Sequence, residues 1–213
     1  MPARLTLISH APTSAQRHSA FPADEPLEQS ALTKLAAINW QPPRAHHILT
    51  APELRTQQTA KALNLAATPT NELRDIAYGT WQGRTLADLY AEDPASIAQW
   101  LSDPNSTPHN GESIADLITR ITNWLTTLLP EAADTQTHTI AITHPAVIRA
   151  AILHTLNAPL HSFWRIDIAP SPSPTSATTA APGPSAPPQP LSRNTIQPTL
   201  TSTKPNKNPR QTS

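Results

Sequence analysis

Two short apolar segments of this chain end in the same way, and they constrain its fold more than any other feature. Leu5–Ser9 and Thr139–Thr143 each have the pattern of a buried strand that closes on a hydroxyl residue. Each is followed directly by a histidine, His10 or His144. In an open parallel sheet, ligands bind just beyond the carboxyl ends of the strands. The two segments therefore predict one pocket that contains both imidazoles.

Strand and helix patterns alternate along the first 168 residues. Further strands are expected at His46–Thr50 and Phe163–Ile168. This alternation predicts an α/β fold, a three-layer α/β/α sandwich with a mostly parallel central sheet. Apolar residues at helical spacing, with prolines at three of the starts, predict the helices. These are Glu28–Asn39, Pro52–Leu65, Arg84–Ala91, Pro94–Leu101, Ser113–Leu129 and Pro145–Leu156.

Composition changes abruptly after residue 168. Residues 169–213 hold 11 of the 25 prolines, many Ser and Thr, four basic residues and no acidic residue. Such a segment buries too little apolar surface to offset its ordering entropy, so we expect a disordered tail. The tail is either a genuine appendage or the product of a frameshift in the gene. Residues 1–168 form the expected domain, with 11 Lys and Arg against 15 Asp and Glu.

The composition also excludes several classes of function. The chain has no cysteine, which rules out disulfides, thiol nucleophiles and cysteine metal sites. The mildly acidic domain argues against a dedicated nucleic-acid binder. No apolar run approaches the roughly 20 residues of a membrane span, and no charged-then-apolar leader opens the chain. We therefore expect a cytoplasmic protein with neither nucleic acid nor membrane as a partner.

Positive groups gather at the same sheet edge as the two histidines. Arg55 falls in the first turn of the helix that follows the His46–Thr50 strand. Its guanidinium offers a bidentate fork suited to phosphate. The helix that begins at Pro145 aims free N–H groups and a positive dipole end at the surroundings of His144. These features predict a phosphate pocket, and no other histidine has spacing that indicates a metal site.

Five motifs in order make the interpretation more specific. Ser9–Ala11 stands where one family has Arg-His-Gly, and Ala51–Ala60 matches its Ser-Pro-Leu-x-Arg-x-x-Gln-Thr-Ala block. Leu73–Gly83 matches Leu-x-Glu-x-x-x-Gly-x-Trp-Glu-Gly, and Gly111–Ser113 is the Gly-Glu-Ser that follows. Thr143–Arg149 matches Ser-His-Gly-Gly-Val-Ile-Arg. The chain resembles the histidine phosphatase superfamily, in its phosphoglycerate-mutase-like branch.

The resemblance implies a role for each matched residue. His10 would attack phosphorus and become a phosphohistidine. Arg55 and His144 would hold the phosphoryl oxygens and stabilise the charge in transfer. Asp75, at the family's Glu position, would protonate the leaving oxygen and then activate water. Neither a metal nor a cofactor is implied, because cationic side chains take the place of Mg²⁺.

The chain departs from the family pattern at the first motif. Ser9 replaces the family's arginine, which removes a positive charge from the expected pocket. Gln16 sits nearest the position where the family uses a polar residue against phosphate. We hypothesise that Arg17 swings into the pocket and compensates for Ser9.

The leading interpretation is a phosphomonoesterase that hydrolyses a small phosphorylated metabolite. One alternative is a degenerate, non-catalytic member that binds phosphorylated ligands. Others are an α-ribazole phosphatase or a phosphoglycerate-mutase-type enzyme. Specificity is expected from residues 21–26 and 91–110, with Trp81 and Trp164 as packing groups. An unpaired sheet edge after residue 168 would lower stability or support a homodimer.

Overall fold

A five-stranded sheet organises the computed structural model, which describes residues 4–128, 137–168 and 177–180. The strand order is β3-β2-β4-β1-β5. The first four strands in this order run parallel, and β5 is antiparallel to β1. The strands are β1 (Arg4–Ser9), β2 (His47–Thr50), β3 (Thr68–Pro69), β4 (His138–Thr143) and β5 (Ala177–Ala180).

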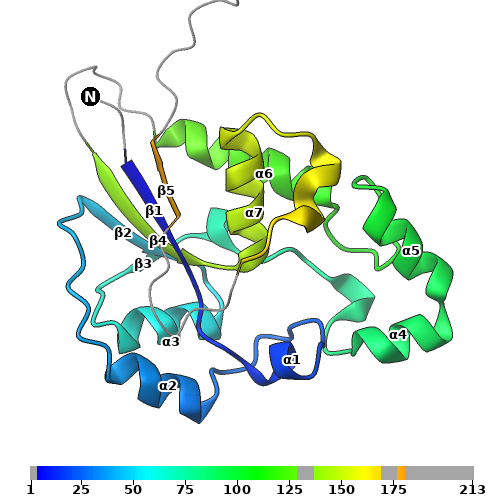
Figure 1. Cartoon of the computed structure of the whole chain (residues 1–213), viewed down its shortest axis with the longest axis horizontal. Coiled ribbons are helices and arrows are strands. Elements are labelled where there is room, and N and C mark those ends of the chain that lie inside the picture. Colours follow the sequence, from blue (N-terminus) through cyan, green and yellow to red (C-terminus); the bar gives the residue numbers. More distant parts are fainter. Residues whose placement is uncertain (1–3, 129–136, 169–176, 181–213) are drawn as a thin grey trace, which may run out of the picture. The chain divides into compact units, whose positions relative to one another are not determined.

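Helices cover both faces of this sheet, as predicted. In Figure 1, α2 and α3 lie on one side of the strands, and α6 and α7 lie on the other. The predicted three-layer α/β/α sandwich with a mostly parallel sheet is confirmed. The helices are α1 (Ser14–Arg17), α2 (Gln29–Ala36), α3 (Leu54–Ala62), α4 (Leu86–Glu92), α5 (Pro94–Ser102), α6 (Ile114–Thr127) and α7 (Pro145–Thr155). Three short 3₁₀ segments join them: η1 (Asn71–Leu73), η2 (Gly79–Trp81) and η3 (Leu160–Arg165).

The alternation of side chains along the strands divides the core in two. Leu7 of β1 and Ala141 of β4 belong to the cluster that α6 and α7 cover. Ile8 and Ile142, one position further along, belong to the cluster that α2 and α3 cover. Successive side chains of a strand point to opposite faces, so each strand contributes to both layers.

The register between β1 and β4 brings the two histidines together. Ser9 pairs with Thr143, and the His10 N–H donates to the Thr143 carbonyl at 2.9 Å. Both strands therefore end at the same level. His10 and His144 leave the sheet side by side at its carboxyl edge.

A third apolar cluster lies outside the two sheet layers. It joins α4 and α5 to the segment after β1 through aromatic side chains. Phe21, Trp81 and Trp100 are buried in it, with Tyr78 and Trp164 packed against it. This cluster borders the site described below.

Two sequence expectations about the end of the domain are corrected. Phe163–Ile168 was expected as a strand, but Leu160–Arg165 forms the 3₁₀ segment η3. Its Phe163 is buried against α7, and the Arg149 Nε–H donates to the Ile166 carbonyl at 2.7 Å, so packing on α7 overrides the alternating pattern. Ala177–Ala180 lies in the segment expected to be disordered, yet it pairs with β1 as β5. The rest of residues 169–213 lies outside the described residues, and the domain boundary at 168 stays a prediction.

Candidate active site

His10 is buried, and its contacts fix which ring nitrogen carries hydrogen. Its side chain is 3% exposed, and Nδ1 lies 2.8 Å from the Ala11 carbonyl oxygen. A carbonyl only accepts, so Nδ1–H is the donor. Burial, followed by repulsion from neighbouring His144, lowers the pKa of His10 from 6.5 to about 4. The neutral ring thus keeps its lone pair on Nε2, the atom available to attack an electrophile.

Thr59 of α3 links Ala11, the neighbour of His10, to the backbone of Arg55 through two hydrogen bonds. Its hydroxyl oxygen accepts from the Ala11 N–H at 3.1 Å and donates to the Arg55 carbonyl at 2.8 Å. Both the peptide that orients His10 and the backbone of Arg55 are therefore held by one buried side chain.

His144 lies beside His10 and is tied to a carboxylate that the sequence reasoning missed. The two imidazole centroids are 5.2 Å apart. His144 is fully buried, and its Nε2–H donates to Glu53 Oε2 at 2.8 Å. Burial alone would raise the pKa of Glu53, but the hydrogen bond and charge of His144 lower it to about 2.

Arg55 reaches the same point from the first turn of α3. Its side chain is 3% exposed, and one Nη bonds Asp75 Oδ2 at 2.7 Å. The other Nη lies 3.8 Å from Asp24. His144 Nδ1 also approaches Asp75 Oδ2, at 3.4 Å. The structure thus brings together all four residues predicted as catalytic.

Several donors in this cluster have no hydrogen-bond partner among the described residues. They are Arg55 Nε and one Arg55 Nη, and the buried His144 Nδ1 also has no hydrogen-bond partner among these residues. The N-terminus of α7 adds to them, because Pro145 and Ala146 border the same cavity. Buried donors of this kind favour an anion. A tetrahedral phosphoryl group is the anion that a guanidinium fork and a helix N-terminus together suit.

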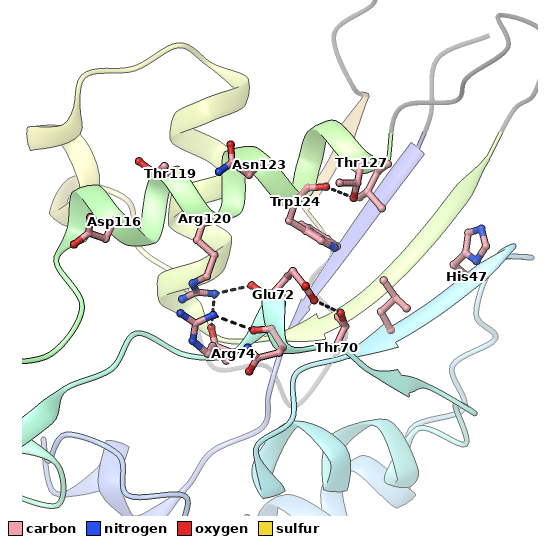
Figure 2. A pocket seen from close by; sticks show the side chains of 13 residues that line it. His47, Thr70, Glu72, Arg74, Asp116, Thr119, Arg120, Asn123, Trp124 and Thr127 are labelled. Atoms are coloured by element: carbon pink, nitrogen blue, oxygen red, sulfur yellow. Dashed lines mark hydrogen bonds between the residues drawn. The ribbon is translucent and has the colours of Figure 1, made fainter.

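The loop that carries Asp75 is held from two sides. The Asp75 N–H donates to Glu53 Oε1 at 2.9 Å, so one carboxylate orients both His144 and the acid. On the other side, the Arg120 guanidinium donates to the carbonyls of Glu72 at 2.6 Å and Arg74 at 3.1 Å (Figure 2). It also donates to the Asp75 carbonyl at 3.4 Å. Arg120 is itself fixed by Glu112, with contacts of 2.8 and 2.7 Å.

Gly79, in the third motif, lies too close to a neighbouring backbone segment for any side chain. Gly79 adopts φ +49°, and a Cβ at this position would lie 2.0 Å from the His109 carbonyl oxygen. The Thr80 N–H donates to the same oxygen at 2.8 Å. Close backbone approach therefore ties the segment after Asp75 to the loop that leads to Glu112.

The predicted substrate-binding residues are only partly brought to the site. Gln16 borders the cavity beside His10, and its Oε1 accepts from the Thr13 N–H. Ser9 is buried at the end of β1, with its hydroxyl 3.5 Å from the His10 carbonyl. Arg17 points elsewhere: its Nε pairs with Glu28 at 2.8 Å, and its side chain is 65% exposed. The structure thus does not place Arg17 as a substitute for the missing arginine.

The site opens into a cavity of about 510 Å³. Its phosphate end is formed by His10, Arg55 and Asp75, and α7 supplies one side. A larger cavity of about 860 Å³ lies between η1 and α6, and Figure 2 looks into it. Its lining includes Arg74 and Arg120 but none of the predicted catalytic residues. The smaller cavity is therefore the candidate active site.

A comparison with protein families decides where the chain belongs. The model of the histidine phosphatase superfamily (branch 1) matches residues 5–185. This chain is a member of that superfamily. The match includes all five motifs and extends past β5, which agrees with the place of that strand in the sheet.

Similar proteins include the adenosylcobalamin/alpha-ribazole phosphatase of Salmonella typhimurium. It is 29% identical over 98 residues, which cover 46% of this chain and 48% of that protein. Among the curated relatives that it matches, this chain spans between about a third and a half of their length.

Solved structures confirm the fold. Bacillus stearothermophilus YhfR has a TM-score of 0.67 at 19% identity, covering 83% of this chain and 90% of that one. The mycobacterial glucosyl-3-phosphoglycerate phosphatase solved with VO3 has a TM-score of 0.64 at 22% identity, covering 78% and 87%.

Within 4–128, 137–168 and 177–180, no three His, Asp or Glu side chains gather as a metal site would require. In the same ranges, every helix is too short or too polar to cross a bilayer.

Proposed function

We propose that this protein is a phosphomonoesterase that hydrolyses a small phosphorylated metabolite through a phosphohistidine at His10. The observation that carries the proposal is the bonding of the His10 ring. Its Nδ1–H is committed to the Ala11 carbonyl at 2.8 Å, so a neutral Nε2 lone pair remains. Arg55 and the α7 N-terminus border the same cavity as His10, which provides the positive groups that a phosphoryl acceptor requires.

In the first half-reaction, His10 Nε2 attacks phosphorus and the bond from phosphorus to the ester oxygen breaks. Arg55, His144 and the α7 N-terminus hold the non-bridging oxygens as charge redistributes. An entering phosphoryl group takes over the Arg55 Nη that now bonds Asp75. Once it is released from Arg55, the Asp75 carboxylate takes up a proton from solvent and donates it to the leaving oxygen; the proton that Asp75 gains from water in the second half-reaction returns to solvent when the pair with Arg55 re-forms.

In the second half-reaction, the same carboxylate accepts a proton from water. The resulting hydroxide attacks phosphorus, the bond from nitrogen to phosphorus breaks, and inorganic phosphate leaves. His10 regains its Nε2 lone pair. No step requires a metal in this scheme, because Arg55 and the imidazole N–H groups supply the positive charge.

The test is turnover of p-nitrophenyl phosphate in the presence of EDTA, with His10→Ala as the matched variant. We expect turnover in the wild type and its loss in His10→Ala. A phosphoryl group should be found on His10 by mass spectrometry after rapid alkaline quenching. Absence of turnover that depends on His10, for p-nitrophenyl phosphate and for a panel that includes α-ribazole phosphate and 3-phosphoglycerate, would refute the proposal.

A second candidate function is binding of a phosphorylated ligand without turnover. One observation favours it: Arg55 is paired with Asp75 and approached by Asp24, while Ser9 supplies no charge. Ser9→Arg separates the two functions. A large gain of activity in Ser9→Arg over an inactive wild type would favour the binding role, whereas wild-type turnover would exclude it.

A further inference from the structure

The part of the active-site cavity away from His10, Arg55 and Asp75, called the chamber below, has a wall of aromatic side chains. Four aromatic side chains border it: Phe21, Tyr78, Trp100 and Trp164. Trp100 and Trp164 pack edge to face with centroids 4.5 Å apart, and Phe21 lies 5.0 Å from Tyr78. The rings come from four separate segments, so the wall is a product of tertiary packing.

Apolar side chains extend this wall towards solvent. Leu86 of α4 is 41% exposed and Leu101 of α5 is 50% exposed, and both border the cavity. Exposed leucines beside a concave site are surfaces that a ligand covers. They lie where a group attached to the ester oxygen would leave the phosphate end.

Polar groups of the chamber are few, and several are already committed. Thr13 Oγ1 accepts from the Gln16 N–H, and Gln16 Oε1 accepts from the Thr13 N–H. A polyhydroxylated leaving group would lose its water here and find few partners in return, which is costly. A flat hydrophobic group loses little water and gains contact with the rings.

Arg149 is the charged side chain of this wall that lies beyond the phosphate end. Its guanidinium carbon is 5.7 Å from the Phe163 ring centroid and 5.8 Å from that of Trp164. Its Nε–H is used by the Ile166 carbonyl. A planar guanidinium held against rings presents a face on which another ring can stack. Trp100 Nε1, which is buried without a hydrogen-bond partner among the described residues, is a further donor at this wall.

We infer that the substrate is a phosphomonoester whose alcohol carries a flat aromatic group, and that the aromatic wall selects it. The inference rests on the proposed phosphatase function and names its substrate class. The expectation that Trp164 only packs is thereby revised, since Trp164 both packs on Trp100 and borders the chamber. The cavity volume of about 510 Å³ lies within the roughly 300–1,000 Å³ of small-molecule sites.

The first experiment compares three primary alkyl esters, so that all leaving alcohols have similar acidity. They are 2-(1-naphthyl)ethyl phosphate, glycerol 3-phosphate and 3-phosphoglycerate. We expect kcat/KM for the naphthyl ester to exceed both others by about 10-fold or more. Equal values, or a higher value for the polyol or the carboxylate ester, would overturn the inference and leave the phosphatase proposal intact.

Variants locate the effect in the wall. Trp164→Ala and Leu101→Ser should each raise KM for the naphthyl ester several-fold more than KM for glycerol 3-phosphate, while Trp164→Phe should restore part of the loss. Tyr90→Ala is the matched control, because Tyr90 is 62% exposed on α4 and lies outside the cavity lining. A uniform change for all three esters in Trp164→Ala and Leu101→Ser would overturn the role of the wall.

A binding measurement separates the two proposals. Calorimetry with 3-(1-naphthyl)propylphosphonate and 3,4-dihydroxybutylphosphonate requires no turnover. Tighter binding of the naphthyl compound supports the substrate class even if no ester is hydrolysed, in which case the phosphatase proposal alone fails. Equal binding of the two phosphonates, or no binding of either, would overturn the substrate class.

Discussion

At the scale of single residues, the burial of His10 has a consequence for stability. The folded protein lowers the pKa of His10 from 6.5 to about 4, chiefly by desolvation. Between these pH values, His10 binds a proton in the unfolded chain but not in the folded protein. The free energy of unfolding therefore decreases as pH falls from 6.5 towards 4. We expect the wild type to lose about 3 kcal/mol more over this range than His10→Asn, whose side chain does not titrate.

Urea denaturation followed by tryptophan fluorescence at pH 7, 5.5 and 4.5 measures this difference. Groups remote from His10 titrate equally in both proteins, so their contributions cancel. Parallel stability curves for the two proteins would show that His10 has an ordinary pKa in the folded state.

Glu53 is the residue whose substitution should affect catalysis without touching substrate. Its two oxygens hold His144 Nε2 and the Asp75 N–H. Glu53→Gln keeps the shape but loses the charge and one of the two acceptors. We expect kcat to fall about 10- to 100-fold with a smaller change in KM, as for other residues that orient reacting groups.

Steady-state kinetics with p-nitrophenyl phosphate provides the measurement. Glu92→Gln is the control, since that carboxylate is 61% exposed on α4. A kcat within two-fold of the wild type for Glu53→Gln would show that His144 and Asp75 are positioned without Glu53.

The sequence identifies the four clustered residues, His10, Arg55, Asp75 and His144, better than the residues that support them. His10 and His144 follow recognisable strands, and Arg55 and Asp75 fall in motifs. Glu53 stands at the start of a helix, where an acidic residue is common for the helix dipole alone, so nothing in one sequence marks its long-range contacts. Its separation from His144 by 91 positions is visible only in the fold.

At the scale of elements, the Arg120–Glu112 pair joins α6 to the loop that carries Asp75. Removing one partner of a buried ion pair costs about 3–5 kcal/mol. Arg74, 3.4 Å from Glu112, would offset part of that cost here. We expect Arg120→Ala to lower the free energy of unfolding by about 3 kcal/mol, and to lower kcat because three carbonyls of the loop lose their donor. Chemical denaturation and kinetics on the same samples provide both readouts.

Arg120→Lys separates charge from geometry. A lysine keeps the charge but has no planar fork to contact Glu112 and the loop together. Stability should recover more than kcat does. Full recovery of kcat in Arg120→Lys would contradict a positioning role for the guanidinium.

Elements with strong periodicity are predicted well. The amphipathic helix at 113–129 and the strand at 139–143 match α6 and β4 within one or two residues at most ends. The sequence does not predict α1 and β3, because elements of four and two residues are too short to show a periodic pattern. η3 was mistaken for a strand because its alternating residues serve packing on α7 instead of a sheet.

At the scale of the whole molecule, β5 covers the outer edge of β1. A chain that ends at residue 168 would expose this edge, with its unpaired N–H and C=O groups. We expect such a chain to melt several degrees lower and to self-associate more than one that ends at residue 185, since about 1 kcal/mol shifts the midpoint by roughly 2–4 °C at this size.

Thermal denaturation and sedimentation velocity on both shortened chains check this expectation. The chain ending at 185 is the control because it keeps β5 and the whole family match. Identical melting temperatures for the two would show that β5 contributes no measurable stability.

The candidate active site contains a counter-ion for its own arginine. Asp75 bonds one Arg55 Nη at 2.7 Å, so a phosphate that binds this Nη must displace the Asp75 carboxylate. The carboxylate stays nearby and bonds Arg55 again when the phosphate dissociates. Under the proposed function, this intramolecular exchange would reduce the affinity for inorganic phosphate and shorten the lifetime of the complex. For a hydrolase that releases phosphate as its last product, the pairing of Arg55 with Asp75 would weaken inhibition by that phosphate.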